Sequence, residues 1–212
     1  MSNYVEWRQK RLKAITDFYG NSFFKGKTLL ELGCGRAHIG KYFSDLGAIV
    51  TACDGRKEHI NYVKTTHPEI KTTITDLDKE FPFKENFDIV INMGLLYHLI
   101  DPLNLIKKTC LIGTWLIIET EVVDSTNPLE YLKIQDESKN YGQSMNGVGV
   151  RLSLAAIENT LKKNDFSFFR VDDDRCSTAT YKYDWVPANT KKWTFSGKVH
   201  LRKIWFCKKE TT

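Results

Sequence analysis

Short runs rich in apolar and β-branched residues recur along the chain, and most are separated by segments whose apolar positions have helical spacing. From residue 27 onward we expect strands at 28–34, 48–54, 71–75, 87–93 and 113–120. Helices fit at 37–46, 57–66, 102–109 and 153–164, the last with Ser153 as its N-cap. This alternation is typical of a mostly parallel sheet covered by helices on both faces.

The chain ends in two further strand-like runs, at 166–172 and 199–209, with no clear helix between them. We expect these two to pair antiparallel at the edge of the sheet. The predicted fold class is α/β: a single domain over residues 1–212 with a doubly wound, seven-stranded sheet, mostly parallel with one antiparallel edge strand. Three segments lie outside the alternation: an N-terminal helical cap at 1–26, an insertion or lid at 121–151, and a substrate-side segment at 173–198.

Composition supports one globular domain, since the 212 residues are 42% hydrophobic and 27% charged. No apolar stretch approaches the roughly 18 residues of a membrane span, and the N-terminus lacks the apolar centre of a secretory signal, so we expect a cytoplasmic protein. The five cysteines are scattered and never spaced as CxxC, and no histidine pair has ligand spacing, which argues against disulfides and a metal site. The formal charge of +5 is mild, so its basic clusters are expected to be mainly solvated surface, although such clusters also attract nucleic acid or an acidic substrate.

The most informative stretch is the glycine turn that ends the first strand, "LLELGCGRAHIG" at 29–40. Gly33 and Gly35 permit positive φ and let the backbone approach a ligand, which in an open α/β sheet lies beyond the carboxyl ends of the strands. The nicotinamide fingerprint GxGxxG is incomplete, because its sixth position is His38. The stretch 20–28 is a poor phosphate loop, since five residues separate its glycines where four are required and it precedes the first strand.

An acidic residue followed by GxG at the end of the first strand resembles the first motif of the class I S-adenosylmethionine-dependent methyltransferases, a Rossmann-like family. The resemblance continues at three more strand ends, where it implies an acidic residue for the ribose hydroxyls, another for the adenine amine, and backbone carbonyls for the methionyl ammonium. It therefore implies S-adenosyl-L-methionine as the cofactor. The implied cofactor-binding residues are Glu31, Gly33, Cys34, Gly35, Asp54, Gly55, Arg56, Asp76, Leu77, Met93 and Gly94.

Methyl transfer requires a positioned nucleophile and, for some acceptors, a base. Tyr97 and His98 follow the fourth strand, and Glu119 and Glu121 end the fifth. His98 is our first candidate for the base, because its unperturbed pKa lies near 6.5, with Tyr97 and Glu119 as the other catalytic candidates. Three readings stay open: His98 packs a helix, a carboxylate takes the proton, or a reactive acceptor needs no base.

Residues of the long segments are candidates for acceptor binding. The glycine-rich stretch 141–151 suits a mobile lid, in which Tyr141 and Arg151 are the predicted substrate-binding residues. An arginine can bind a carboxylate or phosphate with two parallel hydrogen bonds. Tyr4, Trp7 and Arg11 recur at helical spacing, so the N-terminal helix either folds over the cofactor pocket or only covers core.

The acceptor itself is less well specified. The motif [N/D/S]PP[Y/F], which marks many enzymes that methylate amino groups, is missing after the fourth strand, where the sequence is "NMGLLY". We therefore favour methyl transfer to an oxygen or nitrogen of a small molecule. The stretch "GLLYH" resembles the tRNA wobble-uridine carboxymethyltransferases, which makes tRNA modification the alternative. A non-catalytic binding module with the same fold is the third reading.

Overall fold

The structure is a computed structural model that describes residues 3–123, 125–135, 143–183 and 201–210. Its strands are β1 (Thr28–Leu32), β2 (Ile49–Asp54), β3 (Lys71–Ile74), β4 (Phe87–Met93), β5 (Gly113–Val123), β6 (Tyr131–Gln135), β7 (Val148–Ser153), β8 (Phe166–Arg170), β9 (Lys182–Tyr183) and β10 (Leu201–Lys209). Its helices are α1 (Asn3–Tyr19), α2 (His38–Asp45), α3 (Lys57–Thr66), α4 (Pro102–Ile112) and α5 (Leu154–Lys163), with the short 3₁₀ turns η1 (Asn21–Phe24) and η2 (Leu96–His98).

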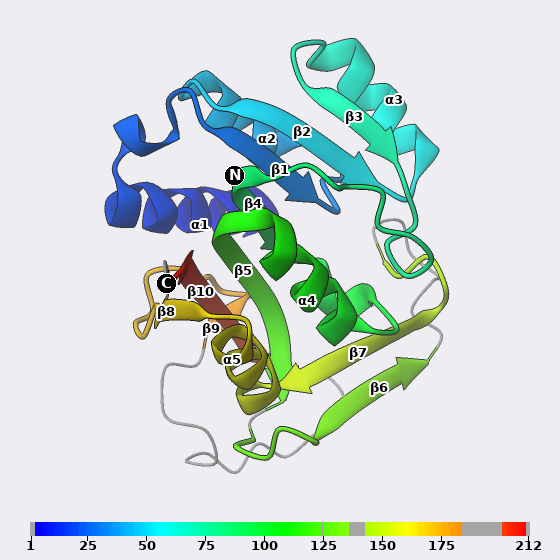
Figure 1. Cartoon of the computed structure of the whole chain (residues 1–212), viewed down its shortest axis with the longest axis vertical. Coiled ribbons are helices and arrows are strands. Elements are labelled where there is room, and N and C mark those ends of the chain that lie inside the picture. The colour runs from blue at the N-terminus through cyan, green and yellow to red at the C-terminus, as the bar shows by residue number, and fades with distance from the viewer. Residues whose placement is uncertain (1–2, 124, 136–142, 184–200, 211–212) are drawn as a thin grey trace.

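Seven strands form the main path of the sheet, in the order β3-β2-β1-β4-β5-β10-β8 (Figure 1). The chain first moves outward from β1 to β3 and then returns to place β4 on the other side of β1, so the direction of winding reverses between β1 and β4. Ligands of open α/β sheets bind beyond the carboxyl ends of strands at such a point. The predicted α/β fold class is confirmed. From this topology, a ligand site is expected at the carboxyl ends of β1 and β4.

The last strand, β10, is the one reversed strand of this path. It runs antiparallel to β5 on one side and to β8 on the other, as the pairs Ile204–Glu119 and Phe206–Phe169 show. The antiparallel pairing predicted for the last two runs is confirmed. The reversed strand itself lies one place inside the edge, because β10 inserts between β5 and β8, and β8 is the outermost strand. Trp205 of β10 is 0% exposed, because its side chain packs in the hydrophobic cluster that α4 and α5 cover.

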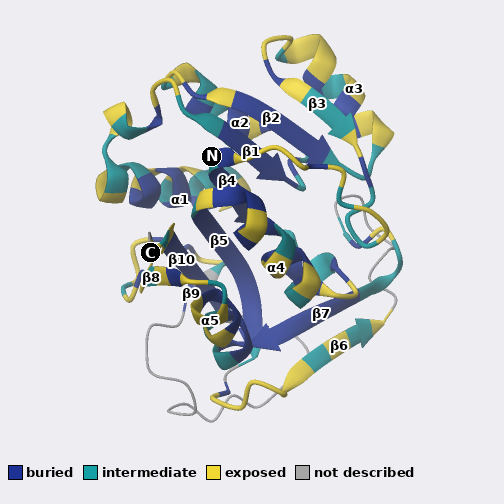
Figure 2. Ribbon diagram, in the orientation of Figure 1, coloured by how far each residue is buried: buried dark blue, intermediate teal, exposed yellow. Residues whose placement is uncertain are grey.

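Three short strands extend the predicted sheet. β5 is long enough to pair with β7 beyond the main sheet, and β6 pairs antiparallel with β7, so part of the predicted insertion 121–151 forms strands. β9 pairs with the start of β10. Figure 2 shows that β5 is buried along most of its length, whereas β6 is exposed at alternate residues.

Two hydrophobic clusters lie on opposite faces of the sheet, because successive strand residues point to opposite sides. Leu30, Val90 and Trp205 belong to the cluster that packs on α4 and α5. Their neighbours Leu29 and Ile89 belong to the cluster that packs on α1, α2 and α3. This two-sided burial is the physical reason that the central strands read as nearly continuous apolar runs in the sequence.

Polar side chains begin the helices that cover one face. The Ser153 hydroxyl accepts a hydrogen bond from the backbone N–H of Ala156 at 3.1 Å, which confirms the predicted N-cap of α5. Asp101 caps α4 in the same way, with Pro102 in its first turn. Within the described ranges, no helix has the length and apolar character that a membrane span requires. All five cysteines are buried and free.

Candidate functional site

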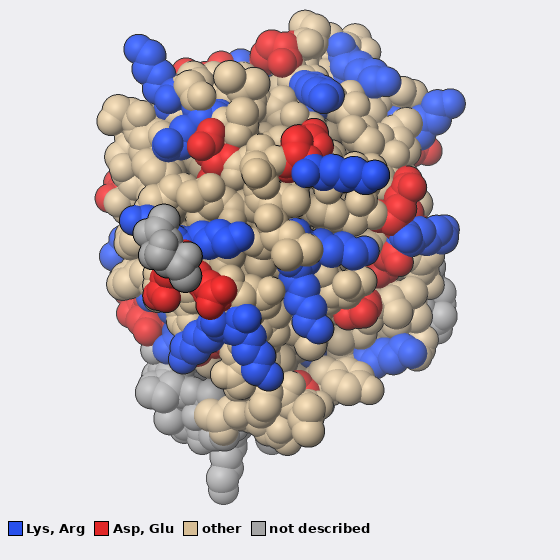
Figure 3. Space-filling model, viewed as in Figure 1, with Lys and Arg blue, Asp and Glu red and all other residues tan. Residues whose placement is uncertain are grey.

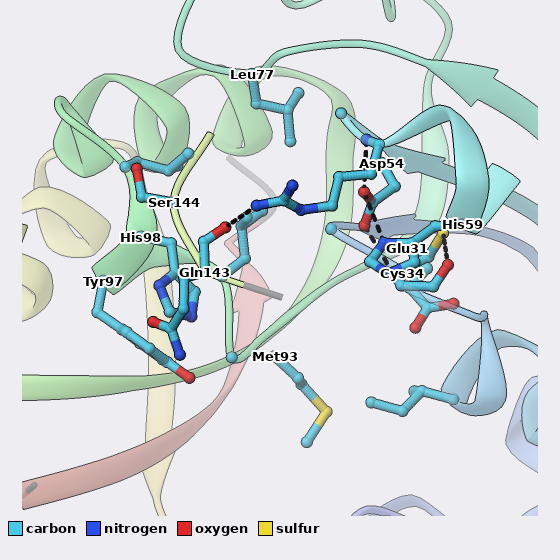
Figure 4. A pocket seen from close by; sticks show the side chains of 18 of the residues that line it. Glu31, Cys34, Asp54, His59, Leu77, Met93, Tyr97, His98, Gln143 and Ser144 are labelled. Atoms are coloured by element: carbon cyan, nitrogen blue, oxygen red, sulfur yellow. Dashed lines mark hydrogen bonds and ion pairs between the residues drawn. The ribbon is translucent and has the colours of Figure 1, made fainter. Parts of the chain in front are cut away.

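A cavity of about 720 Å³ opens beyond the carboxyl ends of β1, β2 and β4. Every cofactor-binding residue predicted from the sequence lines it, and so do Tyr97, His98 and Arg151. Glu119 does not line it, and Tyr141 lies outside the described residues. Figure 4 shows Glu31, Cys34, Asp54 and His59 on one side of the cavity, and Tyr97, His98 and Ser144 on the other.

The glycine turn connects β1 to α2 and forms one wall of the cavity. Gly33 and Gly35 have φ of 65° and 54°, in the left-handed region that the sequence predicts for them. A Cβ atom on Gly33 would lie 2.8 Å from a methyl carbon of Leu95, so a side chain there would also clash with the segment that follows β4. The turn is thus held close to both β4 and the cavity.

Asp54 ends β2 and bridges the glycine turn to the start of α3. Its Oδ2 accepts a hydrogen bond from the backbone N–H of Gly35 at 2.8 Å, and its Oδ1 accepts one from that of Arg56 at 2.8 Å. His59 Nδ1 lies 3.0 Å from Oδ1. Burial alone raises the pKa of Asp54, but the hydrogen bonds with His59 and the two N–H groups outweigh it and hold this pKa below its usual range. Asp54 therefore presents an ionised carboxylate to the cavity.

The pKa of Glu31, in β1, is shifted in the opposite direction from that of Asp54. Its side chain is buried, and Oε2 accepts a hydrogen bond from the backbone N–H of Gly40 at 2.9 Å. Burial is the main reason that the pKa of Glu31 rises to about 8, and the charge of Asp54 adds to it, while Arg8 and Arg11 act in the opposite direction. Glu31 is consequently mostly protonated at neutral pH.

The residues after β2 and β3 form the outer part of the same wall. Asp76 and Leu77 line the cavity, and Asp76 pairs with Lys79 at 3.0 Å. An Nη of Arg56 donates to the backbone carbonyl of Gln143 at 3.0 Å, which ties this wall to the segment before β7. A Cβ atom on Gly55 would lie 3.1 Å from Met145, so this segment lies directly against the turn after β2.

The segment after β4 carries the predicted methionyl-binding backbone and two catalytic candidates. Gly94, with φ of 80°, donates from its backbone N–H to the carbonyl of Glu119 at 2.9 Å. The chain then turns through η2, which places Tyr97 and His98 side by side with ring centroids 4.1 Å apart. Burial raises the pKa of Tyr97 to about 12, although Arg202 acts to lower it, so its hydroxyl stays protonated at neutral pH.

Behind Tyr97 lies a group of buried charges that we name the arginine cluster: Arg11, Arg151, Arg202, Glu119 and Glu121. Arg202 is its centre, since its two Nη atoms donate to Glu119 at 2.9 Å, to Glu121 at 2.8 Å and to the Tyr97 hydroxyl at 2.9 Å. Arg11 donates to the other oxygen of Glu119, and Arg151 donates from Nε to Glu121, both at 3.0 Å. The cluster joins α1, β5, β7 and β10.

The burial and hydrogen bonding of Glu119 differ from those that a catalytic base requires. It is 0% exposed, and both carboxylate oxygens accept hydrogen bonds, from Arg11, Arg202 and the Tyr183 hydroxyl. A base must reach the proton that it removes. This geometry suits Glu119 to positioning α1 and β10, and leaves His98 and Tyr97 as the catalytic candidates on the cavity wall.

Arg8, His59 and Arg202 line the cavity but were missed by sequence reasoning. Arg202 had no distinctive local signal either, because it is one of four basic residues in β10. The N-terminal helix does fold over the cavity: Trp7 stacks on Tyr181 at 4.0 Å and donates from its indole N–H to the Tyr183 hydroxyl at 2.8 Å. Within the described ranges, no three metal-ligating side chains gather in one group.

The sequence is similar to those of known methyltransferases. A family model described as "Methyltransferase domain" matches residues 4–171. A tRNA U34 carboxymethyltransferase of Shewanella baltica is 30% identical over 194 residues, which covers 86% of this chain and 55% of that protein, so the chain spans about half the length of this relative.

Solved structures show the same fold at low sequence identity. The N-terminal domain of EvdMO1, in the presence of S-adenosylhomocysteine (SAH) and D-fucose, has a TM-score of 0.68 at 18% identity and covers 95% of this chain and 82% of its own. The magnesium protoporphyrin IX methyltransferase of Synechocystis PCC 6803, with bound S-adenosylmethionine (SAM), has a TM-score of 0.66 at 14% identity. The match covers 96% of this chain and 80% of that chain.

Proposed function

Because the chain belongs to the family of methyltransferase domains and has the class I fold, we propose that it transfers a methyl group from S-adenosylmethionine to an oxygen or nitrogen of a small-molecule acceptor. The observation that carries this proposal is the single cavity that joins the ends of β1, β2 and β4 to Tyr97, His98 and Arg151. Structural relatives were crystallised with SAM or SAH, which supports the choice of cofactor.

The residues present fit this cofactor. The carboxylate of Asp54 is ionised, and its Oδ2 accepts from the Gly35 N–H while its Oδ1 interacts with both the Arg56 N–H and His59, so Oδ2 has a lone pair left to accept from a ribose hydroxyl. The turn at Gly33 and Gly35 brings backbone, without side chains, to the cavity wall. A volume of about 720 Å³ also lies within the range of sites that hold a drug-sized ligand.

The bound cofactor would supply an electrophilic methyl group on a sulfonium, which an acceptor atom attacks in line. The protein's part is to align the acceptor and to take its proton. We assign the proton to His98, because it lies on the cavity wall and an imidazole can act as a general base. Tyr97 stays protonated, so its role is to donate a hydrogen bond, with its oxygen held by Arg202.

The acceptor side of the cavity is formed by segments outside the main sheet. Tyr4 and Trp7 come from α1, Gln143 and Arg151 from the stretch before and within β7, and Tyr181 from the segment before β9. We assign acceptor binding to this side and include Tyr141 in the proposal by its place in the sequence. The predicted cap and lid functions of 1–26 and 121–151 are part of the same proposal.

Modification of tRNA is the second candidate, and the identity to tRNA U34 carboxymethyltransferases favours it. Figure 3 shows basic and acidic side chains interspersed on one face of the molecule. Binding of tRNA through basic residues releases counterions, so its affinity would fall steeply as salt rises. A gel-shift series with total tRNA from 50 to 200 mM salt therefore separates the candidates: tRNA retained at low salt supports the second, and no retention supports a small acceptor.

The proposed function is tested by calorimetric titration with SAH, followed by screening with methyl-labelled cofactor against pooled metabolites and RNA. Saturation with SAH at about 100 times its dissociation constant should raise the free energy of unfolding by roughly 2.7 kcal/mol. Transfer of label to a small metabolite supports the main proposal. Absence of SAH binding at millimolar concentration would overturn it.

A further inference from the structure

His59 is a buried titratable residue in the wall of the cavity, outside the set of residues that the family resemblance implies. It is the third residue of α3, is 6% exposed, and lies beside Asp54 (Figure 4). Its ring nitrogen Nδ1 lies 3.0 Å from Oδ1 of Asp54. An ionised carboxylate can only accept hydrogen bonds, so Nδ1 carries a hydrogen atom and donates to Asp54.

The hydrogen bonds of the Asp54 carboxylate are divided unequally between its two oxygens. Oδ1 accepts from His59 and, at 2.8 Å, from the backbone N–H of Arg56. Oδ2 accepts from the backbone N–H of Gly35, also at 2.8 Å. Each carboxylate oxygen has about two lone-pair sites. Oδ1 therefore uses both of its sites within the protein, whereas Oδ2 keeps one for a ribose hydroxyl.

The His59 ring is fixed by the helix that carries it. Ile60 and Val63 of α3 are 0% exposed and pack in the hydrophobic cluster on one face of the sheet. The backbone N–H of His59 also donates to the carbonyl of Arg56 at 3.1 Å. An aspartate carboxylate turns about its last bond with little intrinsic preference, so donors at fixed positions decide its direction. Loss of the His59 donor would leave Oδ1 with one hydrogen bond and the carboxylate with more freedom to turn.

His59 also offsets the cost of burying the charge of Asp54. Burial raises the pKa of this carboxyl, and the hydrogen bond from His59 is foremost among the contributions that lower it. An ionised carboxylate is a stronger acceptor for a hydroxyl than a neutral carboxyl group is. His59 thus favours a hydrogen bond from Asp54 to the ribose through both the direction and the charge of the carboxylate.

We propose that His59 is a positioning residue that holds the Asp54 carboxylate with Oδ2 toward the cofactor ribose. The inference rests on the proposed function and deepens it, because it adds α3 to the elements that determine cofactor affinity. Since His59 acts through Asp54, its replacement should weaken only the part of the affinity that the ribose hydroxyls supply. A residue that merely packs α3 would change the affinity for every ligand of the cavity by the same factor.

The test compares SAH with its 2′,3′-dideoxy analogue, in which hydrogen replaces both ribose hydroxyls. Dissociation constants are measured by calorimetry for the parent, His59→Gln, His59→Phe and His59→Asn, and circular dichroism checks their folding. The amide nitrogen of the asparagine can take the place of Nδ1, whereas that of the glutamine reaches the place of Nε2, and phenylalanine keeps a ring without a donor. The parent should prefer SAH about tenfold or more. This ratio should shrink several-fold in His59→Gln and His59→Phe and be largely retained in His59→Asn.

His67→Phe is the matched control, because His67 follows the last turn of the same helix and does not line the cavity. Its ring nitrogens make no hydrogen bond within the described residues, so its replacement should leave the ratio unchanged. A parent-like ratio in His59→Gln and His59→Phe would overturn the proposal, even if both affinities fell together. Equal losses in His59→Asn and His59→Gln would exclude Nδ1 as the donor and overturn it as well. Equal affinity of the parent for the two ligands would remove the ribose from Asp54, and if the parent binds neither ligand, the proposed function itself fails.

Discussion

The two sides of the cavity are built in different ways. On the cofactor side, the predicted residues come from the ends of consecutive strands between Glu31 and Gly94, and backbone N–H groups hold Asp54. On the side that we assign to the acceptor, α1, β5, β7 and β10 each contribute to the arginine cluster, in which Arg11 and Arg202 meet at Glu119. The first side is therefore formed by consecutive elements, and hydrogen bonds from backbone N–H groups and His59 hold its Asp54 carboxylate, whereas ion pairs between distant elements hold the side that we assign to the acceptor.

This difference has a physical consequence. A carboxylate held by backbone N–H groups keeps its setting as long as the turn forms, so its loss should affect ligand binding more than folding. A buried charge network depends on four separate elements and leaves unpaired charges when one member is removed.

Replacement of Arg202 by Met should cause the largest loss of stability. Glu119 and Glu121 would lose their central partner in the protein interior, and breaking a buried ion pair costs about 3 to 5 kcal/mol of folding free energy. Urea unfolding followed by circular dichroism measures this loss. Arg175→Met is the control: it removes an exposed pair with Asp173 and should cost at most about 1 kcal/mol. Equal losses in the two variants would show that the cluster does not stabilise the fold.

Replacement of His98 by Gln should reduce turnover about 100-fold, a loss of roughly 2.7 kcal/mol of transition-state stabilisation, with little change in SAH affinity. The reason is that a glutamine keeps a polar group on the cavity wall but cannot take a proton. The pH dependence of methyl transfer by parent and variant is the decisive measurement, with His67→Gln, outside the cavity, as control. Unchanged turnover with an unchanged acid limb would remove His98 from the mechanism.

Replacement of Asp54 by Asn should weaken SAH binding about 10- to 150-fold, because the ribose hydroxyls would lose a charged acceptor worth about 1.5 to 3 kcal/mol. Stability should change less than in Arg202→Met. Calorimetric titration provides the affinity, and Asp172→Asn serves as control for loss of a carboxylate, since Asp172 is exposed. Parent-like affinity would mean that Asp54 does not bind the ribose.

Glu31 should make the free energy of unfolding depend on pH. Its pKa in the folded protein is about 8, above the ordinary value of 4.5, so its contribution is fully present below pH 4.5 and is lost as the pH rises toward 8. Relative to the parent, Glu31→Gln should therefore gain stability from pH 4.5 to 8, on the order of 1 kcal/mol per pKa unit of the shift. Parallel stability curves for the two proteins across this window would exclude the effect.

Much of the cofactor side was accessible from the sequence alone. The order of strands and helices follows from hydrophobic periodicity, which also places the turn at Gly33, Asp54 and Met93 at strand ends, and the family resemblance implied their roles toward the cofactor. These features depend on residues close together in the chain, so local pattern and backbone geometry specify them. The N-cap Ser153 was predictable for the same reason.

Only the tertiary structure shows which residues meet on the side that we assign to the acceptor. Glu119 at the end of a strand looks like a candidate base in the sequence, but Arg11 and Arg202, 108 and 83 residues away, occupy its oxygens. The place of β10 between β5 and β8 brings Arg202 to the cavity, and no local pattern encodes that insertion. The physical reason is that partners of a buried charge are set by which elements pack together, and packing joins residues that lie far apart in the chain.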